Sequence, residues 1–162
     1  MDRVALAAGR IAAWLFVIAV VITVYEVGAR YLFHAPTNWV HETTTTLCAV
    51  GFALGGAYAF ARDEHIRISV ISDRAPPAIR TALEVFALLL GVIYLAGLAY
   101  AAWGQAEESV WRFDATGWTP ELTPGPPNWP LPAIVRVALA AGTVLFLACV
   151  VQRLALVLAG RR

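Results

Sequence analysis

The sequence predicts an all-α integral membrane protein, in which residues 1–162 form one domain: a bundle of four transmembrane helices with short interfacial segments. Of the 162 residues, 60% are hydrophobic and 14% are charged, whereas an ordinary soluble domain is about 45–50% apolar and about 25% charged. Four stretches are apolar and long enough to cross a bilayer, which takes about 20 residues of helix. Because lipid offers the backbone no hydrogen-bond partners, these stretches must be helices.

The four expected spans cover about residues 11–33, 43–61, 83–104 and 131–152. The first follows Arg3 and Arg10 and resembles the start of a signal peptide. No A-x-A cleavage pattern follows its apolar run, so we expect it to be retained. The second opens on Thr43–Thr46, whose hydroxyls we expect to bond to the backbone one turn back or to pack against a neighbouring helix. The third follows Glu84, and the fourth contains Arg136 near its start.

Arginines predict the orientation, because cytoplasmic loops are enriched in them. Nine lie at the two ends of the chain or between the second and third spans: Arg3, Arg10, Arg62, Arg67, Arg74, Arg80, Arg153, Arg161 and Arg162. The link after the third span instead carries Glu107, Glu108, Asp114 and Glu121 with a single Arg112. We therefore expect both termini to be cytoplasmic and the first and third links to face the opposite side.

The two longer links differ in pattern. In the 62–80 link Ile66, Ile68 and Val70 alternate with polar residues before Pro76–Pro77, which suits an extended or interfacial segment. The link from about Gly104 to Pro130 is rich in proline and tryptophan. Tryptophan at such a position is usually a membrane-interface anchor, and the alternative is a surface that meets another protein.

Arg30 is the basic residue on the unexpected side. Glu26 lies four residues before it, the favourable order for a helical ion pair, and Glu42 is a second candidate across the turn. The alternative is that Arg30 reaches the lipid headgroups. Gly51 and Gly55 form a G-x-x-x-G pattern that could serve either the bundle itself or a partner.

Catalytic and cofactor patterns are not found. Cys48 and Cys149 lie alone in apolar spans at different depths, so we expect no disulfide. His34 and His41 lie near the link between the first and second spans, and His65 lies on the opposite side of the membrane. This placement suits neither a haem between helices nor a recognised metal site. No nucleophile lies near a base, and a net charge of +1 gives no case for nucleic-acid binding. We expect a protein that is not an enzyme and carries no cofactor.

Several short motifs follow one another in an order that resembles a known family, the small (Q-type) membrane subunits of tripartite ATP-independent periplasmic (TRAP) transporters. The motifs are Arg30–Tyr31–x–Phe33, Trp39–x–x–Glu42, Gly55–Gly56–Ala57–Tyr58 with Arg62, His65–Ile66–Arg67–Ile68, Pro76–Pro77 and Pro126–Pro130. The resemblance covers nearly the whole chain. Together with the spacing of Glu26 and Arg30, it gives ten structural or partner-interface candidates: Glu26, Arg30, Tyr31, Trp39, Glu42, Gly55, Gly56, Arg62, His65 and Arg67.

The resemblance implies an accessory subunit of the bacterial inner membrane. Such a subunit braces a large multi-span subunit that carries Na⁺ and substrate, commonly an organic acid, which a periplasmic binding protein delivers. Contact with the binding protein would be transient, and membrane lipid would surround the bundle. An alternative is a stand-alone proton-coupled small multidrug exporter, in which Glu26 would be the working carboxylate. A membrane redox protein is a third reading, and the placement of the histidines and cysteines disfavours it.

Overall fold

The computed structural model of the chain describes residues 2–62, 76–114, 117–124 and 128–159. It contains helices α1 (Asp2–Leu32), α2 (Trp39–Ala61), α3 (Pro77–Val110) and α4 (Leu131–Leu158), and strands β1 (Arg112–Asp114) and β2 (Gly117–Thr119). The strands form an antiparallel hairpin between α3 and α4. Each of the four helices is long and apolar enough to cross a membrane. The prediction of an all-α, four-span protein is confirmed.

The helices extend beyond the apolar spans read from the sequence. α1 has 31 residues and α3 has 34, which gives lengths of about 46 and 51 Å, against a hydrocarbon core of about 30 Å. α3 begins at Pro77 and continues past Gly104 to Val110, so that Glu107 and Glu108 lie in its last turns. The last turns of α3 therefore stay helical although their sequence is polar enough to lie outside the hydrocarbon.

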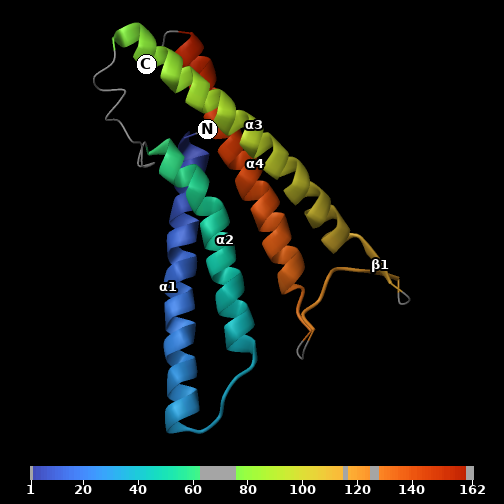
Figure 1. Ribbon diagram of the computed structural model, residues 1–162. Coiled ribbons are helices and arrows are strands. Elements are labelled where there is room, and N and C mark those ends of the chain that lie inside the picture. Colours follow the sequence, from blue (N-terminus) through green and yellow to red (C-terminus); the bar gives the residue numbers. More distant parts are fainter. Residues whose placement is uncertain (1, 63–75, 115–116, 125–127, 160–162) are drawn as a thin grey trace.

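The helices stand in a row in the order α1, α2, α4, α3 (Figure 1). α1 and α2 are antiparallel, α2 and α4 are parallel, and α3 and α4 are antiparallel. The α1–α2 turn, the β-hairpin and the start of α4 lie at one end of the row, which we call the hairpin end. Both chain termini lie toward the other end, the terminal end. α1 and α3 therefore each have one helical neighbour along most of their length.

Two seams of buried residues hold the outer helices to the row. α1 buries Ala5, Ala12, Ala19 and Glu26, at intervals of seven residues. α3 likewise buries Leu88, Leu95, Ala102 and Ser109. A seven-residue repeat keeps one narrow stripe facing the neighbouring helix. In both seams the last position at the hairpin end is polar, and each of these polar side chains belongs to a hydrogen-bonded cluster described below.

Glycines set the closest helix contacts. A Cβ atom on Gly142 of α4 would lie 2.3 Å from the carbonyl oxygen of Ala53 in α2, and one on Gly51 would lie 2.9 Å from the ring of Phe16 in α1. A Cβ atom on Gly55 would meet nothing within 4 Å. The two glycines of the G-x-x-x-G pattern therefore differ, since Gly51 packs inside the row and Gly55 faces open space.

The row leaves a large apolar surface uncovered. The accessible surface of the chain is 11088 Å², whereas a compact monomer of 17.5 kDa would expose about 7,900 Å². Large side chains in three of the helices are mostly exposed, including Phe52 at 75%, Tyr94 at 70% and Tyr100 at 86%. In a membrane these faces must contact lipid or another protein.

Candidate functional site

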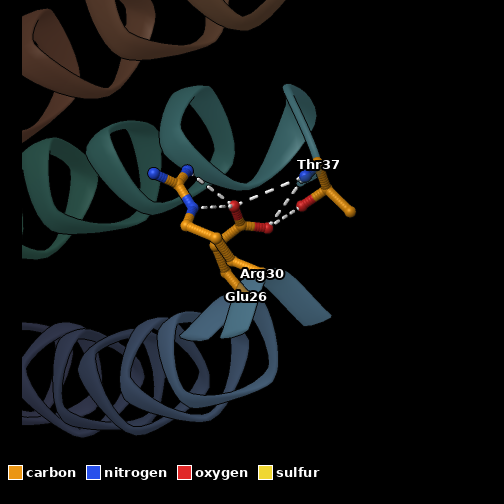
Figure 2. Close-up of polar contacts among 3 residues, drawn as sticks. All are labelled: Glu26, Arg30 and Thr37. Carbon is orange, nitrogen blue, oxygen red and sulfur yellow. Dashed lines mark hydrogen bonds and ion pairs between the residues drawn. The ribbon is translucent and has the colours of Figure 1, made fainter. Parts of the chain in front are cut away.

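Glu26 is the centre of the first polar cluster (Figure 2). The side chain is 11% exposed, because its place in the heptad seam turns it toward the end of α2. Arg30, one turn later, donates from Nη2 to Glu26 Oε1 at 2.8 Å and from Nε at 3.2 Å. Thr37 donates its backbone N–H to Glu26 Oε2 at 3.1 Å and its hydroxyl to the same oxygen. Both carboxylate oxygens are thus engaged.

The turn between α1 and α2 is shaped to bring Thr37 back to Glu26. His34 adopts a φ of 53°, in the left-handed region that commonly ends helices. The backbone N–H of Ala35 then donates to the carbonyl of Ala29 at 3.0 Å. The chain therefore reverses direction after α1, which brings Thr37 into contact with Glu26, eleven residues earlier.

The charges also suit the two helix dipoles. Arg30 lies in the last turn of α1, where backbone carbonyls favour a cation. Asn38, the residue before α2, makes no side-chain capping bond, and the Glu26 carboxylate, held by the N–H of Thr37, lies close to that helix start. The expectation that Arg30 is paired is confirmed, and its partner is Glu26 rather than Glu42.

Glu42 lies in the first turn of α2, and its Oε2 atom is buried without a hydrogen-bond partner. The centroid of the Trp39 ring lies 6.3 Å from the ring centroid of Tyr25 and 6.5 Å from the ring centroid of Trp129. Trp39 therefore joins the ends of α1, α2 and the segment that leads into α4. Thr43, Thr45 and Thr46 donate their hydroxyls to carbonyls four residues back, as the sequence predicted. The hydroxyl of Thr44 is buried without a hydrogen-bond partner.

The remaining candidate residues do not converge on one place. Tyr31 is 73% exposed at the end of α1. Gly56 packs against Phe146 of α4, while Gly55 faces open space. At the terminal end Arg62 donates to the hydroxyl of Tyr58 at 3.3 Å and lies over its ring. His65 and Arg67 lie outside the described residues. What gathers at the hairpin end is the group of Glu26, Arg30, Trp39 and Glu42.

A second polar cluster at the hairpin end was missed by sequence reasoning. Ser109 is 1% exposed and donates its hydroxyl to Glu121 Oε2 at 2.8 Å. The Glu121 carboxylate also binds Arg136 of α4, with Nη1 2.9 Å from Oε2. The seven-residue repeat of α3 could have pointed to Ser109, on which it ends, but not to Glu121 or Arg136. The cluster fastens the hairpin link to α3 and α4.

A third charged contact links α3 and α4 nearer the terminal end, where Arg153 lies 3.6 Å from Glu84. Each of the three pairs joins opposite charges toward one of the two ends of the helix row. Neither Cys48 nor Cys149 forms a disulfide. Among the described residues no three His, Cys, Asp or Glu side chains are grouped closely enough to hold a metal ion.

Two comparisons with known proteins agree on one family. The description "Tripartite ATP-independent periplasmic transporters, DctQ component" matches residues 19–160. The sialic acid TRAP transporter small permease protein SiaQ of Vibrio cholerae serotype O1 is 28% identical over 85 residues, which is 49% of each chain. The matched part thus spans about half the length of that curated relative.

Proposed function

The chain belongs to the DctQ family of tripartite ATP-independent periplasmic (TRAP) transporter components, and from this premise we propose that it is the small permease subunit that braces a large, Na⁺-coupled transport subunit. We place it in the bacterial inner membrane, with both termini cytoplasmic and the hairpin end periplasmic. The transporter would take up an organic acid delivered by a periplasmic binding protein. The name of the Vibrio cholerae relative gives sialic acid, which is an acid of this class.

The open row of helices is the observation that carries this proposal. A protein that exposes about 3,000 Å² more than a compact chain of its size, mostly along apolar helices, offers a broad wall for a second membrane protein. Interfaces between permanent partners run to about 2,000–5,000 Å². That range counts both partners, so one side of such an interface needs about 1,000–2,500 Å², and the exposed surface of this chain is ample for one large subunit.

The placement of charge supports a bracing role over a transporting one. A transporter that works alone usually holds polar or ionisable groups near the middle of the membrane. Here the described charges lie at helix ends, and the central parts of α2, α3 and α4 carry no charged residue. Substrate and Na⁺ would then be handled by the large subunit.

In the exporter alternative, the Glu26 carboxylate would have to bind and release a proton during each transport cycle. Both its oxygens are already bound by Arg30 and Thr37, so a proton would have to displace an ion pair and a turn. The substitution Glu26→Gln separates the two functions. We expect weaker assembly with the transport step intact, whereas an exporter would lose activity while staying folded.

The test is gentle detergent purification of the tagged chain, co-expressed with its neighbouring genes, followed by mass spectrometry. We expect a stoichiometric large multi-span protein to be recovered. Arg30→Ala and Glu42→Ala should lower the yield of that complex without changing substrate affinity, and Glu108→Ala, at the exposed end of α3, serves as the matched control. Recovery of the chain alone as a stable homodimer would refute the subunit assignment.

A further inference from the structure

Helix α3, at one edge of the row (Figure 1), carries a second stripe of residues besides the seam that faces α4. We call this stripe the outer seam. Its positions are spaced alternately by four and three residues: Leu83, Ala87, Leu90, Tyr94, Gly97, Ala101 and Gly104. All seven are exposed. This spacing keeps them on one narrow side of the helix, the pattern of helices that pack along their length.

Small residues form the half of the outer seam nearer the hairpin end. A Cβ atom on Gly97 or on Gly104 would meet nothing within 4 Å, so neither glycine is needed for the packing of α3 on α4. Membrane helices approach one another closely where such small residues line the contact. The exposed side of α1 differs, since it presents branched side chains such as Val20, Val21 and Val24. The outer seam therefore has the shape of a helix contact, and the exposed side of α1 does not.

Tyr94 lies near the middle of the membrane. The part of α3 between Glu84 and Glu107 carries no charged residue. Tyr94 is ten residues from Glu84 and thirteen from Glu107, which places it about 15 Å and about 20 Å from them along the helix. Because the hydrocarbon core is about 30 Å thick, the Tyr94 ring lies in its central part and cannot reach the headgroups on either side.

The Tyr94 hydroxyl selects protein rather than lipid as its neighbour. Tyr94 is 70% exposed, and its hydroxyl makes no hydrogen bond within the described residues. Acyl chains offer no acceptor, so a phenol that faces them at this depth bears the full cost of leaving water. Tyrosine that faces lipid is instead enriched at the interface, where its hydroxyl stays wet. A protein surface with an acceptor at mid-depth satisfies Tyr94.

We propose that a transmembrane helix of the large subunit packs on the outer seam of α3, with a hydrogen-bond acceptor opposite Tyr94. The acceptor belongs to the uncharged polar groups that join membrane helices, a serine, threonine, asparagine or glutamine side chain or a freed backbone carbonyl. This inference rests on the proposed function, and it names the side of the open row that the large subunit covers.

The test is photo-crosslinking within the full chain, co-purified with its partner proteins. The photoreactive amino acid p-benzoylphenylalanine replaces Tyr94 in one variant and Ala96 in the matched control. Ala96 is also exposed and lies two residues later, so it has nearly the same depth but is turned by about 200° around the helix. Mass spectrometry identifies the crosslinked protein.

We expect the probe at position 94 to crosslink to the large multi-span protein and the probe at position 96 to lose that product. If the large protein co-purifies but crosslinks only from position 96, or from neither position, the outer seam is wrong and the subunit assignment stands. A crosslink from position 94 to a second copy of this chain would also overturn the seam. Absence of the large protein from both preparations would contradict the subunit assignment, and the seam with it.

A pair of conservative variants tests the hydroxyl itself. Tyr94→Phe removes the oxygen and keeps the ring, and Tyr100→Phe, at an 86% exposed position nearer the hairpin end, is its control. We expect Tyr94→Phe to weaken retention of the large protein about threefold, which corresponds to about 0.6 kcal/mol, the average for a hydrogen bond between membrane helices. Tyr100→Phe should stay near wild type. Equal retention in the two variants would mean that Tyr94 meets no acceptor, and would overturn the proposal.

Discussion

Glu26 receives both the backbone N–H and the hydroxyl of Thr37, eleven residues later in the chain, with the N–H to Oε2 distance at 3.1 Å. One carboxylate therefore closes the turn between α1 and α2 while it also binds Arg30 (Figure 2). The bonds to Thr37 fix the turn, and the pair with Arg30 compensates the negative charge of the Glu26 carboxylate.

Removal of the Glu26 charge should lower the thermal stability of the protein more than removal of the Thr37 hydroxyl donor. We expect Glu26→Gln to lower the thermal midpoint of the purified protein more than Thr37→Val, because the valine variant keeps the backbone N–H bond and the Arg30 pair. Circular dichroism of both variants in the same detergent measures this. Thr45→Val, which loses only an exposed hydroxyl bond to His41, should stay near wild type. An equal loss in all three variants would contradict the cluster's role.

Gly142 should tolerate no side chain. Its Cβ atom would lie 2.3 Å from the backbone carbonyl of Ala53, and backbone cannot rotate away, so Gly142→Ala must push α2 and α4 apart. We expect a loss of about 1–3 kcal/mol, as for other overpacked interiors. Gly97→Ala, where a Cβ atom meets nothing within 4 Å, should instead gain about 0.5–1 kcal/mol. Unfolding in a denaturing detergent gives both values, and the same sign for both would be inconsistent with this packing.

Gly9 and Tyr58 should be coupled. A Cβ atom at Gly9 would lie 2.1 Å from the Tyr58 ring, so Gly9→Ala should destabilise the α1–α2 contact. Adding Tyr58→Leu should restore part of the loss, with a coupling energy of about 0.5–3 kcal/mol in a double-mutant cycle. Strict additivity of the two substitutions would show that the ring does not occupy the space over Gly9.

Ser109 should matter more than an ordinary serine near a helix end. It is 1% exposed, and its hydroxyl donates to Glu121 at 2.8 Å. We expect Ser109→Ala to cost about 1 kcal/mol and to make the 111–130 link more sensitive to limited proteolysis. The matched variant Thr119→Ala, in strand β2, should leave the cleavage rate near that of wild type. An unchanged pattern in Ser109→Ala would mean that the Arg136 pair and the backbone bond from Glu121 N–H to the Ser109 carbonyl hold the link without the hydroxyl.

Local spacing made half of the first cluster predictable. Glu26 and Arg30 are four residues apart in one helix, and a helix brings such positions together whatever surrounds it. Thr37 could not be found in the same way, because its meeting with Glu26 depends on the left-handed residue His34 and on the path of the turn. The Ser109–Glu121–Arg136 cluster joins three separate elements, so no single periodicity contains it.

The sequence by itself determined that the chain forms four helices long and apolar enough to cross a membrane, and that threonines at the start of α2 can bond to the backbone one turn back. These follow from hydropathy and from the fixed rise of a helix, which act over a few turns. The tertiary structure decided that the helices form the open row α1–α2–α4–α3, that Gly51 packs inside it while Gly55 faces outward, and that Thr37 meets Glu26 across the turn. Those outcomes depend on which helices become neighbours, and that choice is made by close contacts such as Gly142 against Ala53, between residues far apart in the chain.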